Sequence, residues 1–157
     1  MEKILKVLKI VSVLAFMAIL LIVYAYNHQK SDLVLVLGRP DVLALETFFY
    51  TSLAIFMVTN ALFYMFFKMS ETIQPSADKL LFFKNIQSKR VFMLWQESFV
   101  LATNVAFICI VAYLGFINSP VEYNLLSMAP IIYLAPLVVL VSVLSLIVLS
   151  LRLPGQK

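Results

Sequence analysis

Residues 91–117 form an apolar run that is long enough to cross a lipid bilayer, yet it carries the polar residues Gln96, Glu97, Thr103 and Asn104. A membrane-spanning helix needs about 20 mostly apolar residues. Hydrocarbon tolerates polar groups only where protein surrounds them, because the bilayer core supplies no hydrogen-bond partner. This run therefore predicts a helix that packs against other membrane-spanning helices.

Three further apolar runs, residues 4–26, 46–68 and 128–151, have a similar length. The chain of 157 residues is 63% apolar and 13% charged, and its mean hydropathy is +1.01. Soluble domains carry about a quarter charged residues, so membrane is the solvent that fits. No linker or shift in composition divides the chain. We therefore predict an all-α integral membrane protein, a four-helix bundle in which residues 1–157 form one domain.

A cleaved signal peptide is the alternative for the first run, with Val23 and Ala25 as a possible cleavage pair. The apolar core of a signal peptide is usually about 7 to 15 residues long. Residues 4–26 exceed that length, which favours a retained helix.

A short β-hairpin is predicted outside the membrane, between the first two runs. Two arms rich in valine and leucine, residues 33–37 and 42–45, flank the turn-forming residues Gly38, Arg39, Pro40 and Asp41. Both arms are too short to span the bilayer. The alternative is an irregular loop that lies on the membrane surface.

The connection between the second and third runs is polar and net basic. Pro75 and Ser76 are typical of a helix start, and apolar residues between charges follow in residues 79–90. Such a segment either lies as a short helix at the headgroup level or extends the third spanning helix. The sequence favours neither interpretation over the other.

Lysine and arginine are distributed unevenly between the two sides of the predicted bundle. With the N-terminus in the cytoplasm, ten of the twelve basic residues fall on the cytoplasmic side, and only Lys30 and Arg39 face outward. Because orientation follows Lys and Arg in short loops, we predict that both termini are cytoplasmic.

A layer of polar side chains is expected inside the bundle. Glu97 follows Arg90 by seven residues, about 10 Å along a helix, which places it near the inner edge of the hydrocarbon. Asn104 lies about two turns deeper on nearly the same face, and Asn60 in the second run has an intermediate depth. The layer either binds an ion or relays a proton, or it only fixes helix register through hydrogen bonds. The second interpretation is favoured, because transporters usually need more than one intramembrane acid.

Small side chains form a separate stripe on the third run, more than a right angle from the face of Glu97: Ser98, Ala102, Ala106, Cys109 and Ala112. Small residues let helix backbones approach closely, which is how helices associate in lipid. With one polar and one small face, the third helix is predicted to be the most buried of the four. The neighbour of the small face is a helix either of this chain or of another.

Sequence motifs for catalysis or metal binding are absent: there is no Walker loop, no G-x-S-x-G and no H-E-x-x-H. His28 has no second His or Cys at ligand spacing, and Cys109 is the one cysteine, so no metal site is expected. The net charge of +4 comes from residues at the ends of apolar runs, which argues against nucleic acid as a partner. We expect no cofactor and no enzymatic activity.

The first span ending in the residues YAY, the short outer hairpin and the following ETFFYTSLAIFMVTNALFY resemble a group of uncharacterised small four-span bacterial inner-membrane proteins. The resemblance covers about the first half of the chain. It implies a four-span architecture and a bacterial inner membrane as the setting, and it brings no catalytic residue with it.

We expect the protein to be an accessory or scaffolding subunit of a membrane complex. Its partners would be the lipid bilayer and other membrane proteins or further copies of itself, bound through the small stripe or the outer hairpin. The alternative is a small oligomeric transporter or ion-conducting subunit in which Glu97, Asn60 and Asn104 line the path.

Overall fold

The computed structural model describes residues 2–35, 41–76, 81–119 and 125–152. These residues contain four long helices and one two-stranded sheet, in the order α1 (Glu2–Asn27), β1 (Asp32–Val34), β2 (Val42–Ala44), α2 (Leu45–Thr72), α3 (Ile86–Ile117) and α4 (Leu125–Arg152). Each helix is long and apolar enough to cross a membrane. The predicted fold class is therefore confirmed.

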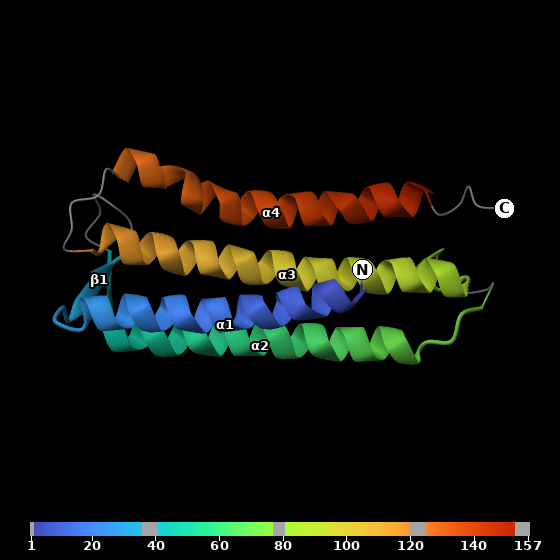
Figure 1. The fold of residues 1–157 in the computed structure, drawn as a ribbon, viewed down its shortest axis with the longest axis horizontal. Helices are drawn as coiled ribbons and strands as arrows, with labels where there is room; N and C mark the ends of the chain where they lie inside the picture. Colours follow the sequence, from blue (N-terminus) through green and yellow to red (C-terminus); the bar gives the residue numbers. More distant parts are fainter. Residues whose placement is uncertain (1, 36–40, 77–80, 120–124, 153–157) are drawn as a thin grey trace.

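Consecutive helices run in opposite directions, so that the N-terminus of α1 and the C-terminus of α4 lie at the same end of the bundle (Figure 1). The central helix is α3, which contacts each of the other three. α1 and α3 bury the same share of their apolar segments, 22%, against 11% for α2 and 6% for α4. Over the described length of each helix, however, α3 has five exposed residues and α1 has thirteen, so the third span is the most enclosed helix, as predicted. The side of the membrane that holds the termini stays a prediction.

The predicted hairpin between the first two spans is present and is held against the end of α3. Its strands pair antiparallel, with Leu33 opposite Leu43, and are shorter than the predicted arms. The buried side chain of Asn118 accepts a hydrogen bond from the Val34 N–H (2.7 Å) and donates one to the Val34 carbonyl (2.8 Å). The ammonium of Lys30 also donates to the Asn118 carbonyl. The predicted turn residues 38–40 lie outside the described residues.

At the opposite end of the bundle, α3 begins earlier than predicted, so residues 86–90 extend the third spanning helix, as one of the two interpretations expects. The Asn85 side chain accepts a hydrogen bond from the Ser88 N–H (2.7 Å) and so caps the helix that starts at Ile86. A single 3-10 turn, Leu81–Phe83, precedes it. The third span is thus extended by five residues beyond the predicted start at residue 91. The helix start expected at Ser76 adjoins residues 77–80, which lie outside the described residues.

The hydrophobic core lies among α1, α2 and α3. The rings of Phe16 and Phe56 stack with centroids 3.8 Å apart, and Phe107 packs edge-on against both, at 6.2 and 5.8 Å. Leu20, on α1, and Leu33, on β1, are fully buried in the same cluster. This cluster fills the space between the middle of the bundle and the hairpin.

α4 packs along α3 on the side away from this core (Figure 1). The indole N–H of Trp95 on α3 donates to the Ser142 carbonyl (2.9 Å) and the Ser145 hydroxyl (3.1 Å) of α4. Both serine hydroxyls donate back to carbonyls of their own helix, as expected for serines in a spanning helix. Pro136 lies inside α4 and lacks the N–H that the carbonyl of Ile132 would otherwise accept.

α1 packs tightly against α3 at Gly115. A Cβ atom at this position would lie 2.5 Å from Cγ2 of Val23, whose side chain is buried. That separation is far below van der Waals contact, and valine is stiff at χ1 and has little room to turn away. Glycine at position 115 therefore sets the distance between the two helices.

We predict that Gly115→Ala destabilises the protein by about 1–3 kcal/mol, the usual cost of overpacking a core. In a Val23→Ala background the clashing methyl groups are gone, and adding Gly115→Ala should change stability by less than about 0.5 kcal/mol. Unfolding in mixed micelles with increasing denaturing detergent measures both values. An equal cost in the two backgrounds would refute the close contact.

Candidate functional site

The most buried polar group within the helices is the side chain of Asn104, which links three of them. It is 0% exposed. Its Nδ2 donates to the hydroxyl of Ser12 on α1 (3.0 Å), and its Oδ1 accepts from Nδ2 of Asn60 on α2 (3.0 Å). The Ser12 hydroxyl in turn donates a hydrogen bond to the Lys9 carbonyl (2.8 Å), and Nδ2 of Asn60 also donates to the Phe56 carbonyl (3.0 Å). Asn104 therefore fixes α1, α2 and α3 relative to one another.

Glu97 lies two turns from Asn104 on α3 and pairs with a lysine of α1. Its carboxylate is 3.7 Å from the Lys9 ammonium, and the whole residue is 3% exposed. The Lys9 ammonium also lies 5.7 Å from the centre of the Phe67 ring, within the range of a cation–π interaction. Glu97 makes no hydrogen bond with Asn60 or Asn104. It is joined to them through α1, because Lys9 and Ser12 lie one turn apart.

Lys9 and Ser12 belong to the site, and neither was predicted as a site residue. By sequence, Lys9 is one of the basic residues that flank the first span, where lysines are expected to face water. A signal was nevertheless present: Lys9, Ser12, Phe16, Leu20, Val23 and Asn27 recur at spacings of three and four along one face of α1. Five of the six are buried in the structure, and Lys9 is partly exposed. This face mixes polar and apolar residues, so hydropathy alone does not reveal it.

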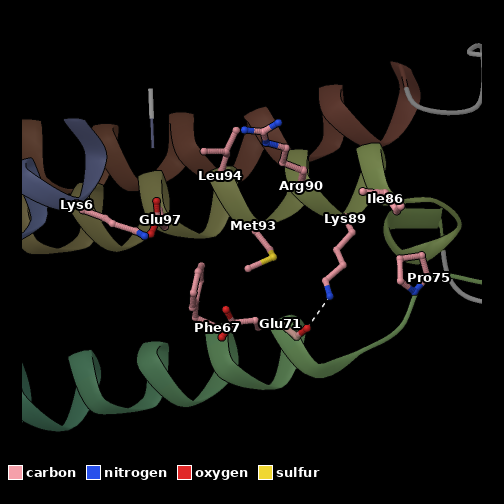
Figure 2. A pocket seen from close by; sticks show the side chains of 10 residues that line it. All are labelled: Lys6, Phe67, Glu71, Pro75, Ile86, Lys89, Arg90, Met93, Leu94 and Glu97. Atoms are coloured by element: carbon pink, nitrogen blue, oxygen red, sulfur yellow. Dashed lines mark hydrogen bonds between the residues drawn. The ribbon is translucent and has the colours of Figure 1, made fainter. Parts of the chain in front are cut away.

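Two neighbouring cavities meet at Glu97. The larger, about 440 Å³, opens at the end of the bundle that holds the termini, and its walls include Lys6, Glu71 and Lys89 (Figure 2). The smaller, about 210 Å³, lies deeper among α1, α2 and α3 and is lined in part by Lys9, Asn60 and Gln96. Both share the side chains of Glu97 and Phe67.

Gln96 adds a second polar link between α2 and α3 at the smaller cavity. Its Nε2 donates to the Ser70 hydroxyl (3.0 Å), which itself donates to the Phe66 carbonyl (2.9 Å). Its buried Oε1 has no hydrogen-bond partner in the described part of the chain. Beyond Asn104 the stacked rings of Phe16 and Phe56 close the space between the helices. The two cavities at Glu97 thus lie on one side of these stacked rings.

The predicted stripe of small residues on α3 does not serve a single neighbour. Ala102 and Ala106 are buried, and Ala106 lines a crevice with α4; Ala112 lines a different cavity with α1. Cys109 is partly buried, and Ser98 is exposed, its hydroxyl bonded to the Leu94 carbonyl of its own helix (3.0 Å). The spacing of small residues along α3 does not reveal that part of the stripe faces α4 and part faces α1.

Within the described residues, no group of three His, Cys, Asp or Glu side chains is close enough to hold a metal ion. His28 is exposed at the end of α1, with Nδ1 2.8 Å from the Ala25 carbonyl. The polar chain from Asn60 to Glu97 thus offers hydrogen bonds and one ion pair between helices.

Comparisons of the chain with protein families, with curated proteins and with solved structures gave no match. The resemblance of the first half of the chain to small four-span bacterial inner-membrane proteins stays a prediction. The fold and the polar site therefore carry the functional argument by themselves.

We predict that Asn104→Leu destabilises the protein by about 1–2 kcal/mol, because Ser12 and Asn60 lose a partner that the bilayer cannot replace. Thr103→Val is the matched control, since the neighbouring Thr103 hydroxyl donates only to the Phe99 carbonyl of its own helix (2.9 Å). Its effect should stay below about 0.5 kcal/mol. Thermal unfolding in detergent gives both values, and equal effects would show that Asn104 does not lock the helices.

Proposed function

We propose that the protein is a non-enzymatic accessory subunit of a membrane complex, and that it binds a spanning helix of its partner along the crevice between α3 and α4. The observation that carries this proposal is the crevice itself. It measures about 610 Å³ and is lined by apolar side chains: Ala106, Ile110, Ile132, Ala135, Pro136, Val139, Leu140 and Val143.

The physical reason is the way helices associate in lipid. Lipid tails are as apolar as leucine, so association depends on close van der Waals packing and on surfaces that let backbones approach. Ala106 and Ala135 place two small, buried residues on facing helices at this crevice. α4 otherwise buries little of its surface, which leaves the crevice accessible from within the bilayer. A partner helix would fill space that acyl chains fill poorly.

The closed polar chain further supports a non-transporting role. Hydrogen bonds join the side chains of Asn60, Asn104 and Ser12 to one another, and the Ser12 hydroxyl donates to a main-chain carbonyl. Glu97 forms an ion pair with Lys9. Hydrogen bonds of this kind fix helix register. A scaffold needs α1, α2 and α3 to keep a fixed arrangement, and these bonds provide it.

We predict that a photo-reactive amino acid at position 140 crosslinks to a protein partner in intact membranes, whereas the same residue at position 137 crosslinks to lipid. Leu140 and Leu137 are matched, since both lie on α4 and are 55% and 53% exposed, and only Leu140 lines the crevice. Ala106→Leu should fill the crevice and remove the adduct. An adduct of twice the mass of the chain would identify the partner as a second copy.

The same adducts at both positions, or none at either, would contradict binding at the crevice. Western blotting against a tag on the chain resolves these outcomes. The lipid adducts at position 137 also show that the reactive group was active.

A small proton- or ion-conducting unit is the second candidate, favoured by the two cavities that meet at Glu97. Against it stand the stacked rings of Phe16 and Phe56, which close the bundle beyond Asn104. A conducting path would have to open there or run between copies of the chain.

We predict no protein-dependent proton flux in liposomes that contain the purified protein and a pH gradient. A pH-sensitive dye inside the vesicles measures the flux. If flux occurs, is lost in Glu97→Gln and is kept in Glu46→Gln, the conducting candidate replaces the accessory role. Glu46 is a suitable control because it is an exposed acid at the other end of α2.

A further inference from the structure

The larger cavity exists because the three packed helices have unequal ends. α1 begins at Glu2, whereas α2 continues to Thr72 and α3 already begins at Ile86, so both extend past the first turn of α1 (Figure 1). Between these extensions lies the cavity of about 440 Å³ (Figure 2). It lies where the apolar segments end and charged residues begin, which is the headgroup level of a bilayer.

Cations dominate the charge around this cavity. Lys6, Lys89 and Arg90 line it together with two acids, Glu71 and Glu97. Each acid already has a lysine that is not part of the lining: Lys68 lies 2.7 Å from Glu71, and Lys9 lies 3.7 Å from Glu97. With Lys68 and Lys9, five basic side chains stand in or beside the cavity against two carboxylates, so its surroundings are net positive.

Two of these cations are held in different ways. The Lys89 ammonium donates to the carbonyls of Glu71 (2.6 Å) and Ile73 (2.8 Å) at the end of α2, which leaves one of its three protons for another acceptor. Lys6 makes no hydrogen bond and no ion pair within the described residues. Figure 2 shows Lys6 and Lys89 on opposite sides of the cavity, with Met93 and Phe67 between them.

The remaining lining is mostly apolar. Phe67, Pro75, Ile86, Met93 and Leu94 provide its walls. A soluble anion would leave these walls in contact with water, whereas an amphiphile with one phosphate and apolar chains matches both parts of the cavity. Basic pockets between spanning helices are known to bind anionic headgroups.

We propose that this cavity binds the headgroup of an anionic phospholipid, with the phosphate between Lys6 and Lys89 and the glycerol and first chain carbons against Phe67 and Met93. The site is separate from the crevice between α3 and α4. Its occupation does not depend on the accessory role.

The test uses the full-length protein in neutral maltoside micelles and native mass spectrometry, which resolves lipid-bound from lipid-free protein. The probes are dioctanoyl phosphatidylglycerol, dioctanoyl phosphatidylcholine and glycerol 3-phosphate. The variants are Lys6→Gln and, as the matched control, Lys3→Gln, which removes the same charge from an exposed lysine one turn earlier on α1 that does not line the cavity.

Phosphatidylglycerol should bind at least tenfold more tightly than phosphatidylcholine, and glycerol 3-phosphate should not displace it. Lys6→Gln should weaken phosphatidylglycerol binding about fivefold, the usual effect of one cation near an anionic headgroup, and Lys3→Gln should change it less than twofold. Lys6→Glu should weaken it further.

Equal binding of the two lipids, or equal effects of Lys6→Gln and Lys3→Gln, would overturn the proposal. Displacement by glycerol 3-phosphate would also overturn it and assign the cavity to a soluble phosphate compound. Because both lysines are exposed on a helix surface, neither substitution should prevent folding, and unchanged thermal midpoints without lipid verify this.

Discussion

A side-chain amide surrounded by hydrocarbon must find its hydrogen-bond partners in the protein, because the bilayer core offers none. Asn104 is such a group, and its two partners, Ser12 and Asn60, come from two different helices. Sliding or rotating α1 or α2 against α3 would break one of these bonds without replacement. The core of stacked rings and the polar chain toward Glu97 both depend on this one fixed arrangement.

The bundle thus combines two kinds of helix contact. α1, α2 and α3 are joined by buried polar groups and by the close approach at Gly115, which together permit few alternative packings. α4 is attached to α3 by apolar side chains and by the indole of Trp95, which bonds to the surface of α4 rather than to a buried group. Contacts of the second kind are more easily rearranged, since no buried polar group is left without a partner when α4 shifts.

The spans and the hairpin were predictable because their signals are local. An apolar run of sufficient length has few alternatives in a membrane, and a Gly-Arg-Pro-Asp sequence between two valine-rich arms favours a turn. The partners of Asn104 and Glu97 were less accessible, since they depend on how α1 is rotated about its axis. Lys9 illustrates the difference. A lysine that flanks a span is expected to face water, but the orientation of α1 about its axis places Lys9 beside Glu97. The early start of α3 depends on the N-cap at Asn85, and a pattern of apolar residues gives no sign of such a cap.

Asn118 stands just past the end of α3 and holds Val34 of the hairpin through both main-chain groups. A ribosome releases residue 34 long before residue 118, so the first strand leaves the translocation machinery without its anchor. The hairpin can dock on Asn118 only after α3 has followed it along the chain, and the bonds to Val34 then close a loop of chain that contains α2 and α3. Docking of the hairpin therefore links the N-terminal part of the bundle to the end of its central helix.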